Sequence, residues 1–271
     1  MSFFICPKCR SDLEKRDNSF YCQNGHCFDV AKSGYVNLLM NNRSSEKPRG
    51  DDKQMVQARK RFLDGGYYDK LIEKLCLICN NLSNEDSIIL DAGCGEGKYT
   101  QSIFYATRQN NVKVYGVDIS KTAVDAAKKR CKDIEYAVAG IDNMPVKDES
   151  VDVLLNIFAP DSESEFSRVL KKNGYFIKVI PLEDHLIELK NVLYDNVVKT
   201  EVKKTKFDSF DTVGFEEIKY GFSLENNESI HDLFTMTPYY YKTSQKDRQK
   251  LENTDRLQIS ACFGIIIYKK K

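Results

Sequence analysis

The sequence predicts an α/β protein in which a small metal-binding module precedes a mostly parallel, doubly wound sheet. Three observations support this prediction. A buried strand at Ile88–Leu90 leads into a glycine-rich turn and then into a helix. Strands and helices continue to alternate from there to about residue 194, which is typical of a parallel sheet. The first 30 residues hold four of the nine cysteines, at the spacing of a zinc site.

The N-terminal cysteines form two short pairs. Cys6 and Cys9 make a C-x2-C pair, and Cys22 with His26 makes a C-x3-H pair. Each pair can bend round one side of a tetrahedral ion, and four protein ligands leave no open position, so we predict one structural Zn²⁺. Zinc would also help so short a segment to fold. Cys27 adjoins His26 and is equally able to be the fourth ligand.

Composition sets the broad class of the protein. A chain of 271 residues can hold one large domain and a small module. No apolar run approaches the ~18 residues of a membrane span, and the N-terminus lacks the pattern of a signal peptide. We therefore expect a cytoplasmic protein with reduced thiols rather than disulfides, and no membrane partner.

Charge is distributed unevenly along the chain. Residues 1–61 hold 12 Lys and Arg against 7 Asp and Glu, a balance of +5, so the other 210 residues carry −4 of the total +1. A basic N-terminal part suggests a polyanionic partner, although chance clustering could also produce this excess.

A polar segment links the module to the rest of the chain. Residues 41–53 read as a linker or loop. Met55–Leu63 has helical spacing that places Arg59, Lys60 and Arg61 largely on the exposed side, where contact with solvent is expected more than contact with nucleic acid. A further helix is predicted from Tyr67 to Leu82.

The glycine-rich turn after Ile88–Leu90 predicts a cofactor site. Its glycines are Gly93, Gly95 and Gly97, and Lys98 stands where the dinucleotide fingerprint G-x-G-x-x-G has its third glycine. Asp91 and Glu96 would repel a pyrophosphate, but they suit a ligand with an ammonium and a sulfonium group. That ligand is S-adenosylmethionine (SAM), and D-x-G-x-G-x-G resembles the first motif of Rossmann-like methyltransferases.

A further carboxylate supports the SAM prediction. The strand Val112–Val117 ends at Asp118, about 20 residues after the glycines, where a ribose-binding carboxylate is expected. The alternative is an ordinary strand–turn–helix unit whose Asp residues cap helices. Under this alternative the turn, the strand and the carboxylates would have to occur together by chance, so we favour SAM.

The remaining elements complete the predicted sheet. In order they are helix Lys121–Cys131, strand Ile134–Ala139, strand Val151–Phe158, helix Ser164–Leu170 with Gly174 just past its end, strand Tyr175–Ile180, helix Leu182–Tyr194, and strands Phe215–Leu224 and Ala261–Tyr268. The last two are expected to pair antiparallel and close the sheet. Asn156–Pro160 would lie at the carboxyl edge, where ligands bind in such sheets, although a simple proline turn is an equal alternative.

The whole chain resembles the 23S rRNA (guanine-N1)-methyltransferases, a family that includes macrolide-resistance enzymes of tylosin producers. The shared residues are the zinc set, F-D-x-A-K-x-G-Y-V-N-L-L at Phe28–Leu39, G-D at Gly50–Asp51, A-R-x-x-F-L-D at Ala58–Asp64, D-x-G-C-G-E-G at Asp91–Gly97, H-L-x-E-L-K at His185–Lys190 and Met236–Pro238. The match covers the chain nearly end to end, and the zinc module joined to this linker is its most specific part.

The resemblance implies an architecture and a set of residues. It implies a zinc-ribbon domain for RNA recognition (1–36), a linker and helix (37–66), and a class I methyltransferase domain (67–271) with a mostly parallel seven-stranded sheet. It also implies that Tyr68 and His185 reach the cofactor, and it favours His26 over Cys27 as the fourth zinc ligand. The expected partner is 23S rRNA, and two copies could act together as a homodimer.

The expected reaction is methyl transfer from SAM to N1 of a guanine in a 23S rRNA hairpin loop. Something must remove the N1 proton, and Asp161 and Asp142 are weak candidates. The guanine must leave its stack, with Phe158 or the tyrosines at 239–241 as possible stacking surfaces. The alternative is a small-molecule or lipid methyltransferase in which the zinc ribbon is merely structural.

Overall fold

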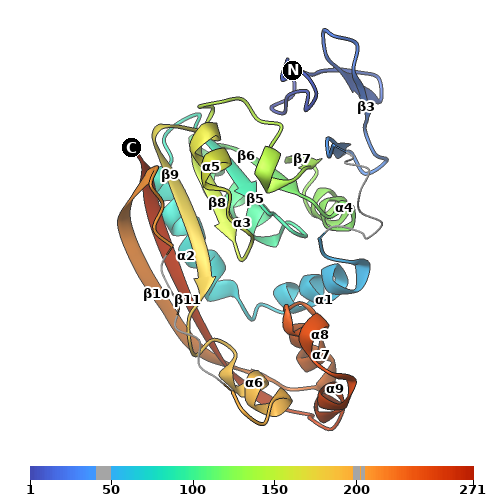
Figure 1. Cartoon of the computed structure of the whole chain (residues 1–271), viewed down its shortest axis with the longest axis vertical. Helices are drawn as coiled ribbons and strands as arrows, with labels where there is room; N and C mark the ends of the chain where they lie inside the picture. Colours follow the sequence, from blue (N-terminus) through green and yellow to red (C-terminus); the bar gives the residue numbers. More distant parts are fainter. Residues whose placement is uncertain (41–49, 198–201, 203–204) are drawn as a thin grey trace.

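An eight-stranded sheet forms the centre of the molecule (Figure 1). The computed structural model describes residues 1–40, 50–197, 202 and 205–271. Residues 41–49 of the predicted linker lie outside the described residues. A separate three-stranded sheet belongs to the N-terminal module, which lies beside β7 and α4 in Figure 1.

The strands, in chain order, are β1 (Glu14–Arg16), β2 (Ser19–Tyr21), β3 (Cys27–Asp29), β4 (Val36–Asn37), β5 (Ile88–Ala92), β6 (Lys113–Asp118), β7 (Glu135–Val138), β8 (Val151–Ile157), β9 (Leu170–Pro181), β10 (Phe210–Leu224) and β11 (Leu257–Lys270). The α-helices are α1 (Lys53–Asp64), α2 (Asp69–Leu82), α3 (Lys98–Thr107), α4 (Lys121–Arg130), α5 (Glu163–Val169), α6 (Ile187–Leu193), α7 (Asn227–Thr235), α8 (Tyr239–Lys242) and α9 (Gln245–Glu252). Two short 3-10 helices are η1 (Arg108–Asn110) and η2 (Ile141–Asn143).

The order of the strands confirms a doubly wound sheet. It reads β10-β11-β9-β8-β5-β6-β7-β4, and the strands from β9 to β4 are parallel. The order reverses at β5, so the glycine turn after β5 lies at the switch point where such sheets bind ligands. β11 runs antiparallel to both β9 and β10, which confirms the antiparallel pairing predicted for the two C-terminal strands.

The predicted count of seven strands is wrong, because the N-terminal module contributes an eighth. β4 pairs parallel with β7, with Val36 opposite Ala137 and Asn37 opposite Val138. A two-residue strand is too short to show any periodic pattern in the sequence. The sheet therefore extends into the segment that the sequence assigns to the zinc module.

The two faces of the sheet bury alternate residues of each strand. Ile89 belongs to the core that includes Leu71 and Leu75 of α2, whereas Leu90 belongs to the core on the other face. That second core also contains Phe4 and Leu13 of the N-terminal module. The module thus shares its apolar core with the sheet, which a segment of its size could not build alone.

Polar and aromatic contacts fix the N-terminal module on the sheet. The ring of Phe3 stacks on Tyr115 with centroids 3.8 Å apart. The backbone N–H of Ile5 donates to the carbonyl of Pro145 at 2.9 Å, and the Ser33 hydroxyl bonds Asp125 at 2.7 Å. The module therefore has one defined position relative to the sheet.

Two predicted helix boundaries are wrong. α6 begins at Ile187 instead of Leu182, since Leu186 adopts a left-handed conformation with φ 57°. α5 passes directly into β9, and Asn173 rather than Gly174 takes the left-handed conformation there, with φ 64°. Gly174 is needed for space, because a Cβ would lie 2.9 Å from the carbonyl oxygen of Lys171. None of the helices in the described ranges has the length and apolarity to cross a membrane.

Candidate functional site

The glycine turn between β5 and α3 is closely packed. Gly93, Gly95 and Gly97 all have positive φ values, of 93°, 55° and 83°. A Cβ on Gly93 would lie 2.5 Å from the Cβ of Ala159, so any side chain at this position would force Ala159 to move. The N–H groups of Gly93 and Cys94 donate to the carbonyl of Val117 at 2.8 and 3.0 Å. The turn is thereby fixed against the end of β6.

The structure places Asp118 beside this turn. Its carboxylate accepts hydrogen bonds from the N–H of Gly95 at 3.0 Å and from the N–H of Ser120 at 2.7 Å. Burial raises its pKa, while these two bonds act in the opposite direction. A carboxylate oriented in this way can accept bonds from vicinal hydroxyls, as the SAM prediction requires.

Asp91 has an unsatisfied oxygen. The residue is 1% exposed, and its Oδ2 accepts a bond from the Thr100 hydroxyl at 2.6 Å. Oδ1 is buried with no hydrogen-bond partner among the described residues, and burial raises the pKa of Asp91 to about 7. An orphaned buried acceptor costs about 1–3 kcal/mol. A cationic donor entering the turn would remove that cost, so the residues present fit an ammonium-bearing ligand.

Glu96 is engaged elsewhere. It is buried, and its carboxylate accepts from Nε of Arg130 at 2.7 Å and from the N–H of Lys98 at 3.2 Å. Arg130 also bonds Asp64 at 2.7 Å. Glu96 therefore joins α1 and α4 to the turn through an ion-pair network, and its contact with the cofactor stays a prediction.

Tyr68 and His185 meet, although 117 residues separate them. Nδ1 of His185 accepts from the N–H of Cys262 at 3.2 Å, and burial lowers the pKa of His185 to about 3, so the ring is neutral. Its proton is therefore on Nε2, which lies 3.4 Å from the Tyr68 hydroxyl. Phe263 packs against both rings, with centroids 4.9 Å from Tyr68 and 4.7 Å from His185.

Arg59 was expected on a solvated face, but it faces the glycine turn. Its side chain is 28% exposed, it forms an ion pair with Asp51, and its Nη2 donates to the carbonyl of Met236 at 3.0 Å. Its Nη1 lies 3.7 Å from where a Cβ on Gly95 would be. The carbonyl of Asp51 in turn accepts from Ser120 at 2.6 Å. Helical spacing gave no sign of this position, and the shared A-R-x-x-F-L-D segment was the only available signal.

The neighbours of Arg59 also have acidic partners. Lys60 bonds Asp64 at 2.7 Å, and Nε of Arg61 bonds the buried Asp232 at 2.8 Å. These basic side chains of α1 therefore make intramolecular ion pairs.

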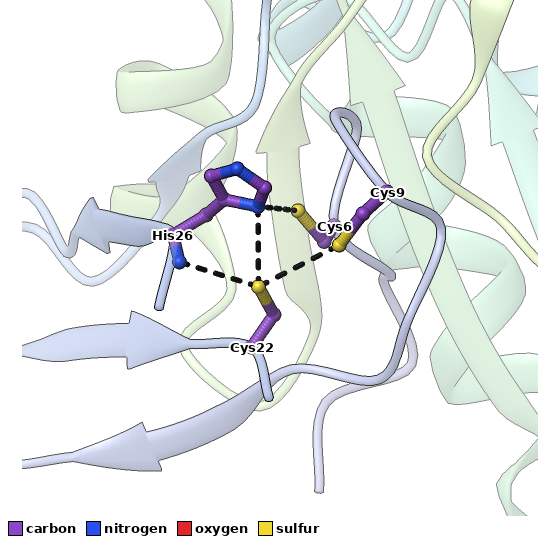
Figure 2. A group of neighbouring side chains, drawn as sticks. All are labelled: Cys6, Cys9, Cys22 and His26. Atoms are coloured by element: carbon purple, nitrogen blue, oxygen red, sulfur yellow. Dashed lines mark hydrogen bonds between the residues drawn. The ribbon is translucent and has the colours of Figure 1, made fainter. Parts of the chain in front are cut away.

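Three cysteines and one histidine converge in the N-terminal module (Figure 2). Their ligand atoms all lie within 4.8 Å of one another. Nδ1 of His26 lies 3.4 Å from Sγ of Cys6 and 3.3 Å from Sγ of Cys22, and Sγ of Cys9 lies 3.6 Å from Sγ of Cys22. Cys27 is exposed and lies outside this cluster. Three thiolates and one imidazole are a donor set that suits zinc.

The carboxyl edge of β8 carries an exposed, strained aromatic residue. Phe158 is 44% exposed and has a φ of 56°, which is unusual for a bulky residue. Its ring lies 5.6 Å from that of Phe263. Asn156 holds the following loop by donating to the carbonyl of Pro160 at 2.8 Å. Asp161 forms an ion pair with Lys178 of β9.

Two family models match different parts of the chain. A model described as a methyltransferase domain matches residues 83–237, and a zinc-ribbon model described as "RlmA, N-terminal" matches residues 4–45. The first covers the glycine turn and the second covers the cysteine cluster. Together they confirm a class I methyltransferase fold preceded by a zinc ribbon.

Curated relatives extend this likeness over most of the chain. YxjB of Bacillus subtilis, whose name assigns it provisionally to the 23S rRNA (guanine-N1)-methyltransferases, is 33% identical over 92% of this chain and 90% of its own length. The 23S rRNA (guanine(748)-N1)-methyltransferase of Streptomyces fradiae is 35% identical over 70% of this chain and 68% of its own length. This chain belongs to the 23S rRNA (guanine-N1)-methyltransferase family.

The family assignment rests on these sequences. Among solved structures, the YcgJ protein of Bacillus subtilis aligns with a TM-score of 0.48 and 16% identity, over 73% of this chain and 98% of that one. As a member of the family, the chain has SAM and zinc as its cofactors.

Proposed function

We propose that this protein methylates N1 of a guanine in a hairpin loop of 23S rRNA. The observation that carries the proposal is the fixed junction between a zinc ribbon and a SAM-type glycine turn. The ribbon presents exposed basic residues, Lys8 and Lys15 among them, and shares its core with the sheet that ends in the turn. Two relatives named for this activity, one of them provisionally, align with 92% and 70% of this chain.

Different residues around the turn would bind different parts of SAM. Asp118 would bind the ribose hydroxyls, Asp91 would bind the ammonium group, and the Gly93–Gly97 backbone would approach the ligand closely. Tyr68 and His185 would close the site from the opposite side. When bound, SAM supplies an electrophilic methyl group. Exclusion of water by the buried aromatic residues and alignment of the guanine are then the contributions of this chain.

Phe158 would receive the guanine. An exposed aromatic ring at the carboxyl edge of β8 offers a stacking surface to a base that has left its own stack, at about 1–3 kcal/mol per base. A strained backbone at such a position is maintained only where the surrounding structure enforces it, and the next residue, Ala159, packs against Gly93. As the N1–methyl bond forms and the sulfur–methyl bond breaks, the N1 proton must leave. Asp161, three residues beyond Phe158, is our candidate acceptor.

A methylation assay tests the proposal. Deproteinised 23S rRNA is incubated with the protein and labelled SAM, and the modified nucleotide is mapped. Transfer to guanine N1 is expected, whereas transfer only to small metabolites or lipids would contradict the proposal. Primer extension on rRNA from cells that lack the protein would identify the guanine.

Two cysteine variants test the recognition role of the ribbon. Cys6→Ala should lose zinc and RNA methylation while it keeps affinity for S-adenosylhomocysteine. Cys27→Ala is the matched control, since Cys27 lies outside the cluster, and it should keep the metal and the activity. Normal RNA methylation by zinc-free Cys6→Ala would show that the ribbon does not recognise RNA.

We also propose the RNA partner of the protein and the cellular compartment of the reaction. 23S rRNA is the partner, and the reaction takes place in the cytoplasm where that RNA is made and assembled. A homodimer stays a prediction, which the mass of the protein in solution and on the RNA hairpin tests. The same holds for the division into residues 1–36, 37–66 and 67–271, which limited proteolysis tests.

A further inference from the structure

The candidate cofactor site lacks an assigned partner for one charged group of SAM. The methionine end of SAM carries an ammonium and a carboxylate at neutral pH. Asp91, Glu96 and Asp118 are all acidic, so none of them can bind the carboxylate. A carboxylate removed from water needs a cation or several N–H donors. A cation beside the turn would meet this need.

Arg59 lies where such a cation is needed. Its Nη1 is 3.7 Å from the position of a Cβ on Gly95, the central glycine of the turn. Burial is the main cause that raises the pKa of Asp118, and the positive charge of Arg59 acts against it. Burial also raises the pKa of Tyr68 on the other side of the candidate site, and the positive charge of Arg59 again acts against that rise. Its guanidinium therefore lies beside the turn and close enough to Tyr68 for its charge to act on both.

The other cations near the turn are engaged differently. Arg130 is bound by Glu96 and Asp64, and its side chain is almost fully buried in that network. Lys98 lies 3.6 Å from Asp64, and Arg61 is paired with Asp232. Arg59 uses two of its N–H groups on Asp51 and the carbonyl of Met236. A guanidinium has five N–H donors, so it can bind a further carboxylate while these contacts hold it in place.

We propose that Arg59 binds the carboxylate of the methionine portion of SAM, and that Asp51 and the Met236 carbonyl position its guanidinium. The inference rests on the proposed function only for the identity of the cofactor. It assigns a cofactor-binding role to a helix that precedes the methyltransferase domain predicted at residues 67–271. The linker helix α1 would thereby become part of the cofactor site.

Ligand truncation tests this inference without RNA. Calorimetry measures the affinity of each variant for S-adenosylhomocysteine, which has the carboxylate, and for 5′-methylthioadenosine, which lacks the amino-acid end. Arg59→Ala should bind S-adenosylhomocysteine at least tenfold more weakly and 5′-methylthioadenosine within twofold of wild type. Arg59→Lys should fall between, because an ammonium keeps the charge but not the fork of donors. Lys60→Ala, which removes the same charge from the next residue of α1, should change neither affinity.

The outcomes separate this inference from its alternatives. Equal loss of affinity for both ligands in Arg59→Ala would mean that Arg59 only maintains the fold, and no loss for either would mean that it does not reach the cofactor. Both results overturn the inference. Since neither ligand needs RNA, failure of rRNA methylation beside a carboxylate-specific loss would refute the proposed substrate and leave the role of Arg59 standing.

Discussion

The two sides of the candidate cofactor site come from very different parts of the chain. One side, here called the floor, consists of residues 91–97 and Asp118. The other side, here called the wall, consists of Asp51, Arg59, Tyr68, His185 and Met236. The floor is held mainly by backbone hydrogen bonds between neighbouring strands, such as those from Gly93 and Cys94 to Val117. The wall is held by side-chain contacts between segments up to 177 residues apart, including the bond from Arg59 to the backbone carbonyl of Met236.

This difference indicates what each side contributes. A floor of backbone and buried carboxylates is rigid and imposes its shape on the ligand. A wall of side chains from α1, α2 and the segments before α6 and α8 can form only when those elements pack together. We therefore expect changes in the floor to have large effects on folding and binding, and changes in the wall to have smaller, ligand-specific effects.

The largest effect should come from the ion pair beneath the floor. Arg130→Gln removes the partner of the buried Glu96, and breaking such a pair costs about 3–5 kcal/mol of unfolding free energy. Burial is the first cause that raises the pKa of Glu96, and Arg130 opposes it. Without Arg130, Glu96 should take up a proton, so the loss measured by chemical denaturation should be greater at pH 8 than at pH 5.

The control is Lys129→Gln, because the exposed side chain of Lys129 pairs with Asp125 at the surface. A surface pair of this kind contributes at most about 1 kcal/mol. Equal stability of the Arg130 and Lys129 variants would show that the Glu96 network does not support the floor.

The second effect concerns the turn itself. Gly93→Ala places a Cβ 2.5 Å from that of Ala159 at a φ of 93°, so Ala159 and its loop must move. Left-handed strain and overpacking together should cost about 2–4 kcal/mol. The affinity for S-adenosylhomocysteine should fall together with the stability. Gly221→Ala, where the nearest atom is 3.7 Å away and φ is not positive, should cost less than about 1 kcal/mol.

These two sides also differ in how far the sequence predicts them. The β5–turn–α3 unit, Asp118 and the Cys6–His26 cluster were all predictable, since each depends on local spacing and on the geometry of parallel strands. Arg59 was not, because helical periodicity marks only the face of α1 and the partners that cover it lie in distant segments. The bond between Glu96 and Arg130 was not predictable either, since the two residues lie 34 positions apart, and the contact of Glu96 with the cofactor stays a prediction. The eighth strand was missed because its two residues carry no pattern.

The third effect concerns the pKa of Asp91, a residue of the floor, and distinguishes it from Arg59 of the wall. Burial raises this pKa to about 7, so below pH 7 most molecules carry a neutral carboxyl group. An ammonium group binds the ionised form, so binding of S-adenosylhomocysteine should release a proton. Its affinity should therefore rise up to tenfold per pH unit between pH 5.5 and 7, and level off near pH 8. Asp91→Asn should bind more weakly at pH 8 and lose this pH dependence, whereas Arg59→Ala should retain it.

The smallest effect should come from the wall. Tyr68→Phe leaves Nε2–H of His185 without the hydroxyl that lies 3.4 Å away, a long hydrogen bond whose loss should cost about 1 kcal/mol of stability. The ring itself stays packed on Phe263, so the fold should persist, and affinity for S-adenosylhomocysteine should fall less than in Gly93→Ala. Tyr67→Phe, at the adjacent residue, controls for the loss of a hydroxyl from the same segment. If Tyr68→Phe instead destabilises the protein as much as Gly93→Ala, then the wall is as integral to the fold as the floor, and the distinction between an imposed floor and an assembled wall is wrong.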